Sequence, residues 1–317
     1  MAYKDVISAL SPDFWWELNG DETDSADSLD SDGGTDPSWV ASIVPAVSGT
    51  HECGDYNGSS SLTQLPTSSD LIGNTTTYEK SISLWFYADT IDTNGNGRVI
   101  WGEGATQNSL SIYVYDDSGT DRLYFCVAED SGSAIDYVST PISVGTLYHV
   151  GATLDCNTGE MHLYLNGSLV GSKTGGLSIG SDFAAHSGGN GFGGADYSSG
   201  LINHNGDNNT GYFDGRIADI AYWGEQSVLG ESDFDSIYQA GVAAVEFEQE
   251  GFRWRSDDGD EDAATWLQAQ DVNLARGKNQ NTRLRVLVDA TGNPPSRTAT
   301  LQFRKVGDPD SEWETVS

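Results

Sequence analysis

Residues 211–223 read Gly-Tyr-Phe-Asp-Gly-Arg-Ile-Ala-Asp-Ile-Ala-Tyr-Trp, the segment from which the fold of the chain is predicted. Its β-branched and aromatic residues are typical of a strand rather than a helix. The apolar phase changes between Ile217 and Ile220, which predicts either a bulge at Ala218-Asp219 or a strand covered on both faces. We interpret the stretch as the last central strand of a large antiparallel sandwich.

Five segments upstream of this strand alternate in polarity with a period of two. Such alternation is typical of antiparallel strands that place one face on a shared core. The residues expected to point inward are Ile82, Leu84 and Phe86; Leu110, Ile112 and Val114; Leu123, Phe125 and Val127; Val150, Ala152 and Leu154; and Met161, Leu163 and Leu165. Downstream, helical spacing over 231–240 predicts one short helix that ends at Gly241.

Composition and charge predict two domains. The chain has 317 residues, with 38 Gly, 14 Tyr and 9 Trp, which favours β structure and suits one large domain plus a small one. The net charge is −33; residues 245–317 hold nine basic against fourteen acidic residues (−5), so residues 1–244 carry −28. We therefore expect domains at 1–244 and 245–317. A surface this acidic repels phosphate backbones, so no nucleic-acid partner is expected.

The sequence also indicates where the chain is made and whether its cysteines are bridged. Residues 1–4 lack the basic and apolar regions of a signal peptide, and there is no apolar segment of 18 residues, so we expect synthesis in the cytoplasm of a host cell and no membrane insertion. The cysteines are Cys53, Cys126 and Cys156, an odd number without metal-like spacing. Free buried thiols are favoured over a bridge between Cys126 and Cys156.

Aromatic side chains occupy the second face of the alternating strands. They are Trp85, Tyr87, Tyr113, Tyr115, Tyr124 and Tyr164, together with His149 and His162. Two interpretations stay open: packing against neighbouring strands or another layer, or a platform on which a sugar stacks. The Gly/Asn/His-rich connection 181–210 adds His204 and Asp207 to the candidate ligand site, because a connection of this length is usually functional or buried in an assembly.

Taken together, several short segments resemble the laminin-G-like, concanavalin A-like jelly-roll domain. They are Trp15-Trp-Glu-Leu18, Asp55-Tyr-Asn-Gly58, Ser81-Ile-Ser-Leu-Trp-Phe86, Leu147-Tyr-His-Val150, His162-Leu-Tyr-Leu-Asn-Gly167, Phe213-Asp-Gly-Arg-Ile-Ala-Asp-Ile220 and Ile237-Tyr-Gln-Ala-Gly241. The resemblance implies an all-β jelly-roll sandwich over residues 1–244. It also implies that any ligand binds in variable loops, so no binding residue is transferred from the family.

The resemblance further implies calcium as a candidate cofactor. Residues 92–103 fit the calcium-loop pattern D-x-[DN]-x-[DN]-G-x5-E, with oxygen ligands from Asp92, Asn94, Asn96 and Glu103. A solvated Asn-Gly turn gives the same letters by composition alone. The acidic loop with Asp24 and Asp27 is a second candidate, again weighed against a merely solvated loop.

Catalysis is not expected. The same fold hosts glycosidases, which need two carboxylates on one face of a strand. The nearest matches are Glu22-Thr-Asp24, in a Ser/Asp loop, and Glu231-Ser-Asp233, on the expected helix. Neither lies on an apolar strand where the pKa of a carboxyl would be raised. We therefore predict a protein without enzymatic activity.

Residues 245–317 predict a small second β-sandwich. They resemble the short immunoglobulin- or fibronectin-like modules of tailed-bacteriophage structural proteins through Gly251-Phe-Arg-Trp-Arg-Ser-Asp-Asp258, Ala264-Thr-Trp-Leu267, Asn281-Thr-Arg-Leu-Arg-Val286 and Leu301-Gln-Phe-Arg304. Four arginines alternate with apolar residues, and we expect them on one exposed face that either docks on an acidic partner chain or only aids solubility. They are Arg253, Arg255, Arg283 and Arg285.

The leading hypothesis is a bacteriophage virion structural protein, either a capsid decoration or a fibre subunit located in the virion. Its jelly roll would face outward, and its partners would be other virion proteins, copies of itself and host-surface glycans. The alternative is a calcium-dependent carbohydrate-binding adhesion module. A glycoside hydrolase fragment is a third hypothesis, against which the missing carboxylate pair counts.

Overall fold

The computed structural model describes residues 2–27, 29–47, 49–66, 79–91, 96–104, 108–129, 132–178, 189–195, 200–224, 228–242, 246–258, 265–277, 280–291, 302–303 and 314–315. The chain divides into two compact units, Met1–Ala244 and Val245–Ser317. The boundary between the two units separates residues 1–244, with a net charge of −28, from residues 245–317, with a net charge of −5.

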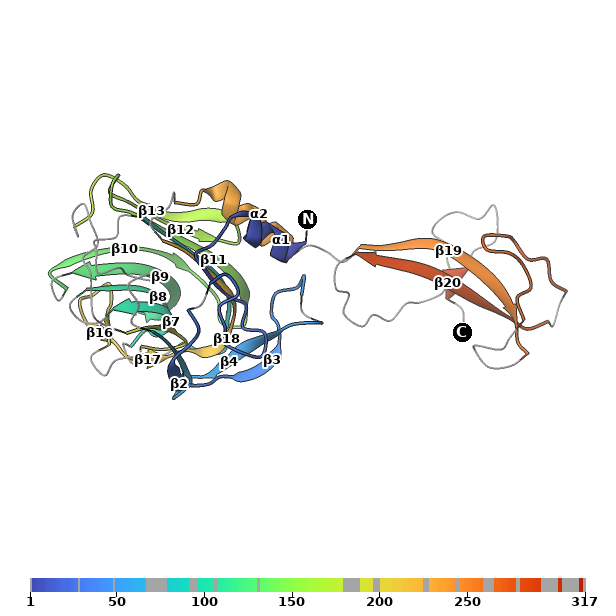
Figure 1. The fold of residues 1–317 in the computed structure, drawn as a ribbon, viewed down its shortest axis with the longest axis horizontal. Helices are drawn as coiled ribbons and strands as arrows, with labels where there is room; N and C mark the ends of the chain where they lie inside the picture. The colour runs from blue at the N-terminus through green and yellow to red at the C-terminus, as the bar shows by residue number, and fades with distance from the viewer. Residues whose placement is uncertain are drawn as a thin grey trace. The chain divides into compact units, whose positions relative to one another are not determined.

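The first unit is built from two curved antiparallel sheets of eight strands each (Figure 1). One, here the β6 sheet, has the order β13-β12-β11-β6-β18-β4-β3, with β1 beside β18. Its strands are β13 (Ser168–Lys173), β12 (Glu160–Leu165), β11 (Leu147–Asp155), β6 (Glu79–Ala88), β18 (Asp214–Gly224), β4 (Glu52–Asn57), β3 (Ser38–Ala41) and β1 (Phe14–Trp16).

The other sheet, here the β8 sheet, has the order β10-β9-β8-β7-β14-β5-β2, with β17 parallel to β7. Its strands are β10 (Ala134–Pro141), β9 (Thr120–Glu129), β8 (Ser109–Asp117), β7 (Arg98–Gly104), β14 (Asn190–Phe192), β5 (Leu62–Leu65), β2 (Gly33–Thr35) and β17 (Gly211–Tyr212). A small ribbon of β15 (Leu201–Ile202) and β16 (Asn208–Asn209) lies outside both sheets.

The main core fills the space between the two sheets and confirms the period-two prediction. The inward residues expected from the five alternating segments all contribute to it, with Leu165 only partly buried. Three large rings, those of Trp16, Trp101 and Phe192, pack together in this core with centroids 5.7–6.3 Å apart. The chain is therefore an all-β jelly-roll sandwich over residues 1–244.

Strand β18 is central, as expected, because β6 and β4 flank it. Its pairing with β6 shifts register between Ala218 and Ala221, which confirms the bulge. Asp219 sits in that bulge with φ 49°, a left-handed conformation that Asp tolerates better than most residues. The bulge lets Ile217 and Ile220 both face the core.

Two helices cover the outer face of the β6 sheet (Figure 1). Helix α2 (Glu231–Gly241) confirms the predicted helix, and the Asp233 carboxylate accepts the N–H of Gly230 at its start. Helix α1 (Tyr3–Ala9) was not predicted from the sequence. Both helices bury apolar side chains in a second core on the sheet, so this face is not open to solvent. Among the described residues, no helix is long and apolar enough to cross a bilayer.

Two other sequence predictions have clear outcomes. The three cysteines are free and buried, as expected, and burial raises the pKa of Cys53 to about 11 and that of Cys126 to about 12. The interpretation of 181–210 as one continuous loop was wrong. Strand β14 lies within it and pairs with both β7 and β5, so part of this stretch completes the β8 sheet.

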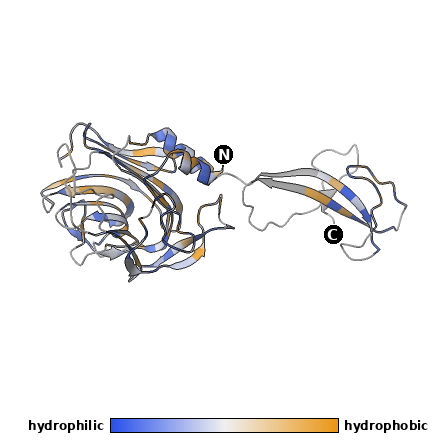
Figure 2. Cartoon of the chain, in the orientation of Figure 1, coloured by the Kyte–Doolittle hydropathy of each residue, from blue (hydrophilic) through white to orange (hydrophobic). Residues whose placement is uncertain are grey.

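The second unit contains two antiparallel ribbons in its described residues. β19 (Glu246–Ser256) pairs with β20 (Thr282–Thr291), and β21 (Gln302–Phe303) pairs with β22 (Glu314–Thr315). Hydrophobic residues and arginines alternate along residues 252–255 of β19 and 283–286 of β20 (Figure 2). Residues 265–267 bond to the free edge of β19 through Ser256 and Trp254. The expected immunoglobulin-like architecture of this unit stays a prediction.

Candidate functional site

The outer face of the β8 sheet carries a cluster of tyrosines. Tyr113 on β8 lies directly opposite Tyr124 on β9, and their rings stack with centroids 5.2 Å apart. Tyr115, two residues along β8, is on the same face, and Tyr137 comes from β10. The period of two along three adjacent strands therefore gathers four tyrosines on one surface.

His204 completes this cluster from the turn after β15. Its ring stacks on Tyr124 with centroids 4.0 Å and planes 17° apart, and meets the rings of Tyr115 and Tyr137 edge-on at 5.0 and 5.5 Å. We call Tyr113, Tyr115, Tyr124, Tyr137 and His204 the aromatic cluster. Edge-to-face and offset contacts of this kind stabilise rings beyond the area they bury.

Hydrogen bonds fix the histidine in its position. The backbone N–H of His204 donates to the Tyr113 hydroxyl at 3.0 Å, and that hydroxyl lies 2.9 Å from Nδ1 of the same histidine. The phenol can accept the first bond and donate the second, an arrangement that leaves Nδ1 unprotonated and the hydrogen on Nε2. A donor N–H of the imidazole is thereby left for another partner.

The turn that presents His204 is stabilised by asparagines. Asn203 accepts the backbone N–H groups of Asn205 and Asp207 through Oδ1, at 2.8 and 3.1 Å. Asn209 accepts the N–H of Gly97 at 2.9 Å, which ties the turn to the start of β7. Gly206 adopts φ 84°, which glycine does without strain. The side chains of the Asn-rich stretch therefore hold backbone groups in place.

Exposure divides the cluster into a buried base and an accessible top. Tyr113 and Tyr124 are buried, Tyr115 and His204 are half-buried, and Tyr137 is 45% exposed. At the rim, Asp117 accepts the Tyr124 hydroxyl at 3.2 Å and Arg122 donates to the Ser139 hydroxyl at 3.0 Å. The surface thus combines exposed ring faces with polar groups of both charges.

Burial favours the neutral forms of Tyr124 and His204 in the cluster. Burial raises the pKa of Tyr124 to about 12, with Asp117 adding to the effect. Burial, helped by Arg122, lowers the pKa of His204, while Asp117 and Asp207 act in the opposite direction. His204 is therefore neutral at pH 7. Flat rings beside neutral and charged hydrogen-bonding groups suit a ligand with an apolar face and many hydroxyls.

The aromatic residues for which two interpretations were left open lie on two different sheets, so they do not form one continuous surface. Trp85 is buried under both helices of the β6 sheet, donates to the Tyr3 hydroxyl at 2.9 Å and stacks on Tyr238. Tyr164 is buried against Phe234 of α2, with ring centroids 4.7 Å apart. The covering-layer interpretation applies to these two residues.

The other predicted aromatic and polar residues have separate outcomes. Tyr87 lies near the end of β6, where the Arg216 guanidinium is 5.2 Å from its ring centroid. Tyr113, Tyr115 and His204 come together in the aromatic cluster. Asp207 is exposed in the same turn as His204. Sequence reasoning missed Tyr137, although the alternation of Ile135, Tyr137 and Ser139 along β10 was a usable signal.

The predicted calcium loop is interrupted by a strand. β7 begins at Arg98, so Glu103 lies inside the sheet rather than at the end of a loop. Its carboxylate accepts Lys80 Nζ at 2.6 Å and the Trp101 indole at 2.9 Å in the core, which corrects its assignment as a loop ligand. Asp92 and Asn94 lie outside the described residues, and Asn96 precedes β7.

The acidic loop near residue 24 is organised by backbone bonds. The Asp24 carboxylate accepts the N–H groups of Trp15, Ala26 and Leu29, at 2.8 to 3.2 Å, and is buried. Asp27 is exposed. Among the described residues, no group of three or more His, Cys, Asp or Glu side chains is arranged to hold a metal ion. Calcium binding stays a prediction.

The carboxylates weighed for catalysis have other partners. Glu22 is buried and accepts the Thr63 hydroxyl, and burial raises its pKa, so the expectation of an unshifted carboxyl in this loop was wrong for Glu22. Glu231 accepts the N–H of Leu169 at 3.0 Å, and Asp233 caps α2. The hydrogen bonds of these three carboxylates therefore connect parts of the fold.

The four C-terminal arginines do not share one exposed face in the way expected. Arg253 and Arg285 lie directly opposite each other on β19 and β20, as do Arg255 and Arg283. Arg255 is only 3% exposed, because Trp266 lies over it, with the guanidinium carbon 4.8 Å from the ring centroid. Burial by this third segment could not be read from the alternation of β19 alone.

Comparison with known proteins agrees with this architecture. Residues 57–228 match the family model described as Concanavalin A-like lectin/glucanases superfamily. No curated protein matches the chain. Among solved structures, domain 4 of AbnA, an extracellular GH43 arabinanase from Geobacillus stearothermophilus solved with arabinotriose, is 17% identical with a TM-score of 0.50, over 72% of this chain and 98% of that one.

Two bacterial neurotoxin domains are also similar. The binding domain of botulinum neurotoxin serotype G is 14% identical, with a TM-score of 0.53 over 77% of this chain and 56% of that one. The binding domain of botulinum neurotoxin DC, solved in complex with SialylT, is 11% identical, with a TM-score of 0.51 over 78% and 57%. The chain thus spans a little over half of these domains, and at such identities the likeness concerns the fold. Since the family model covers more than half of its length, this chain belongs to the concanavalin A-like lectin/glucanases superfamily.

Proposed function

We propose that residues 1–244 form a carbohydrate-binding module that holds a glycan on the aromatic cluster. The observation that carries the proposal is the half-open surface of Tyr137, Tyr115 and His204, whose rings meet at 5.0 and 5.5 Å above a buried tyrosine base. The lectin-type fold and the glycan complexes of two similar domains support it.

Each group of the aromatic cluster and its rim would make a different contact with the bound sugar. The apolar face of a sugar ring packs on Tyr137, the most exposed ring of the cluster. Neutral His204 offers its Nε2–H to a hydroxyl, while the Asp117 and Asp207 carboxylates accept hydroxyl hydrogens. The base of Tyr113 and Tyr124 keeps His204 oriented before the ligand arrives, which lowers the entropic cost of binding.

A glycan array followed by calorimetry on the strongest ligand tests the proposal. Tyr137→Ala should weaken binding about tenfold, because it removes an exposed stacking ring without opening the core. Leu169→Ala is the matched control, since Leu169 is similarly exposed but lies on β13 of the other sheet. The proposal fails if the native protein shows no saturable glycan binding, or if both variants bind alike.

A chelator separates the calcium-dependent form of this function from the calcium-independent one. If glycan binding is lost in chelator and restored by Ca²⁺, the adhesion-module hypothesis with a metal in the site gains support. If binding is unchanged, the aromatic cluster acts without a metal. The array also bears on the hydrolase hypothesis, because a glycosidase would shorten the bound oligosaccharide over time.

A role as a bacteriophage virion subunit is a further part of the proposal. It is supported by the likeness of residues 245–317 to phage structural modules and by the contrast between an acidic first unit and a second unit rich in arginine. Its partners would be other virion proteins and copies of this chain. Imaging of particles assembled without the chain tests this part, since an unchanged particle surface would rule it out.

A further inference from the structure

The charges around the aromatic cluster are unequal in sign. Three charged side chains influence the pKa of His204, namely the carboxylates of Asp117 and Asp207 and the guanidinium of Arg122. Asp117 also accepts the Tyr124 hydroxyl at 3.2 Å, which places one carboxylate directly on the cluster. Both aspartates are exposed, whereas Arg122 is half-buried. A ligand that lies on the rings therefore meets two open carboxylates and one partly covered cation.

The hairpin beside the cluster adds to the negative charge. Asp116 lies directly opposite Asp121 where β8 passes into β9, and Asp117 follows on β8. Asp116 accepts the N–H of Gly119 at 2.6 Å, so its carboxylate is held in the hairpin. Residues 1–244 as a whole carry a net charge of −28. Because such a field lowers the local concentration of anions, an anionic ligand is disfavoured before it reaches the rings.

The arginine at the rim is turned toward a protein partner. Arg122 donates from Nε at 3.2 Å and from Nη2 at 3.0 Å to the same atom, the hydroxyl oxygen of Ser139. These two nitrogens form an edge of the guanidinium that can bind a carboxylate by both of its oxygens. An anionic sugar would therefore have to displace Ser139 before this edge of Arg122 could hold it.

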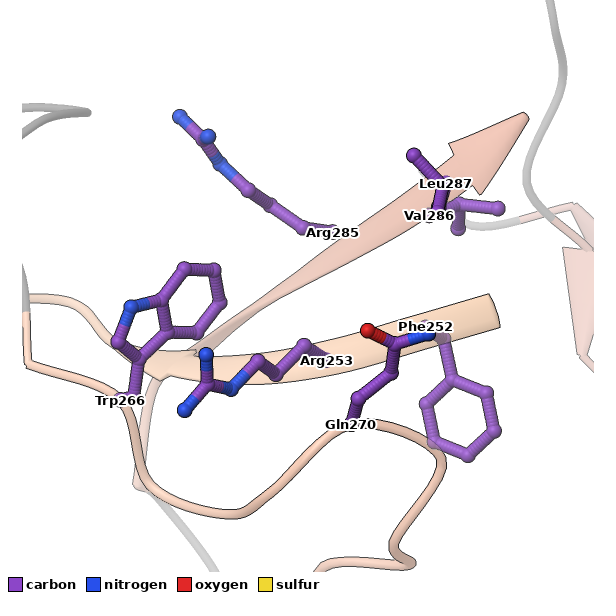
Figure 3. A pocket seen from close by; sticks show the side chains of 7 residues that line it. All are labelled: Phe252, Arg253, Trp266, Gln270, Arg285, Val286 and Leu287. Atoms are coloured by element: carbon purple, nitrogen blue, oxygen red, sulfur yellow. The ribbon is translucent and has the colours of Figure 1, made fainter. Parts of the chain in front are cut away.

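A pocket in the second unit is lined differently. Arg253 and Arg285 come from neighbouring strands and both line a pocket of about 300 Å³, with Trp266 beside Arg253 (Figure 3). At the aromatic cluster, two carboxylates accompany the guanidinium of Arg122 instead. Since both surfaces belong to one chain, any binding of an anionic glycan has to be assigned to one of them. The loss of binding in Tyr137→Ala makes that assignment.

Resting on the proposed function, we infer that the aromatic cluster selects uncharged glycans and rejects those that carry carboxylate or sulfate groups. An uncharged sugar can place its apolar face on Tyr137 and donate hydroxyl hydrogens to Asp117 and Asp207, because an ionised carboxylate accepts hydrogen bonds and cannot donate them. An anionic group on the sugar would lie near the same two aspartates, and like-charge contacts of this kind exclude wrong partners from binding surfaces. Asp117 and Asp207 are therefore the specificity-determining residues.

The test uses the full chain on a glycan array that carries uncharged oligosaccharides beside their sialylated, sulfated and uronate-containing forms. The native protein is compared with Tyr137→Ala, and only the binding that the variant loses is assigned to the aromatic cluster. That binding should be to uncharged glycans, with each matched anionic form bound at least about tenfold more weakly. The difference should shrink with added salt, because salt screens the repulsion between exposed charges.

A charge variant tests the two named aspartates. Asp117→Asn combined with Asp207→Asn should reduce the preference for the best-bound uncharged glycan over its sialylated form at least about threefold, measured by calorimetry as a ratio of affinities. A ratio is needed because Asp117 also contacts the uncharged sugar. The matched control is Asp27→Asn combined with Asp32→Asn. It removes the same two charges from exposed positions in the loop that leads into β2, at the far edge of the β8 sheet from β9 and β10, and should leave the ratio unchanged.

The outcomes separate charge selection from glycan binding itself. If no glycan binding depends on Tyr137, the proposed function fails and the inference fails with it. If an anionic glycan binds at least as tightly as its uncharged form and loses that binding in Tyr137→Ala, the cluster is a glycan site but charge selection is overturned. An equal ratio in the Asp117/Asp207 variant and its control would overturn the role of these two aspartates.

Discussion

Lys80 and Glu103 form an ion pair across the interior of the jelly roll, with Nζ and Oε2 2.6 Å apart and both side chains buried. Lys80 belongs to β6 and Glu103 to β7, so the pair joins the two sheets. The Lys80 ammonium also donates to the Tyr222 hydroxyl at 3.0 Å, and the carboxylate accepts the Trp101 indole. The charges are therefore well compensated where they lie.

Breaking this pair should be costly. Lys80→Met leaves a buried carboxylate without its cation, and we expect a loss of about 3–5 kcal/mol in the free energy of unfolding. Urea denaturation measures the loss. The double variant with Glu103→Gln should recover a substantial part of it, because the uncompensated charge is then gone. A single-variant loss below about 1 kcal/mol would contradict the structural role of the pair.

Helix α2 packs on the β6 sheet through a position where only glycine fits. A Cβ added at Gly151 would lie 2.4 Å from Cδ1 of Phe234. Gly151→Ala should therefore destabilise the protein by about 1–3 kcal/mol through overpacking. Gly171→Ala is the control, because its added Cβ would meet Val138 at 3.4 Å, and thermal unfolding should show little change there. Phe234→Leu should partly rescue Gly151→Ala if the ring causes the clash.

The sequence predicted the inner faces of the strands better than the outer ones. Alternation shows that Leu84 and Trp85 point to opposite sides of β6, but it does not show what covers each side. Trp85 and Tyr113 have the same pattern, yet one lies under two helices and the other under a single histidine turn. The covering helix α1 has only seven residues, too few for a clear helical period.

The candidate site was only partly predictable for the same reason. His204 and Tyr113 are 91 positions apart, and nothing local in the sequence indicates that they share hydrogen bonds. The calcium-loop pattern at 92–103 shows the opposite difficulty, a local match to a motif that the fold does not use as a loop. Its letters matched a known motif, but Glu103 is a core residue whose partner Lys80 lies on another strand.

Asp219 should make stability depend on pH. Burial, together with Glu17, raises the pKa of Asp219 to about 8, while Lys4 opposes the shift. The unfolded carboxyl ionises near pH 3.9, so the folded state binds more protons between about pH 4 and 8, and stability falls as the pH rises through that window. Asp219→Asn, which keeps the left-handed conformation accessible, should lose less stability than the native protein between pH 5 and pH 8 in urea denaturation. Exposed Asp27→Asn is the control, and equal pH dependence in all three proteins would refute the role of Asp219.

Glycan binding should be insensitive to pH near neutrality and decline in acid. Burial and Arg122 lower the pKa of His204 below the ordinary pKa of histidine. The imidazole therefore stays neutral from pH 8 down to that ordinary pKa, and its Nδ1 can accept the Tyr113 hydroxyl. Protonation at lower pH converts Nδ1 into a donor, breaks that arrangement and places a cation in a site built for a neutral ring. Calorimetric affinities should therefore be constant between pH 8 and 7 and weaken only at a pH below the ordinary pKa of histidine. His204→Gln should bind more weakly but lose this decline, and a decline that persists in the variant would place the titrating group elsewhere, with Asp117 and Asp207 the first carboxylates to replace.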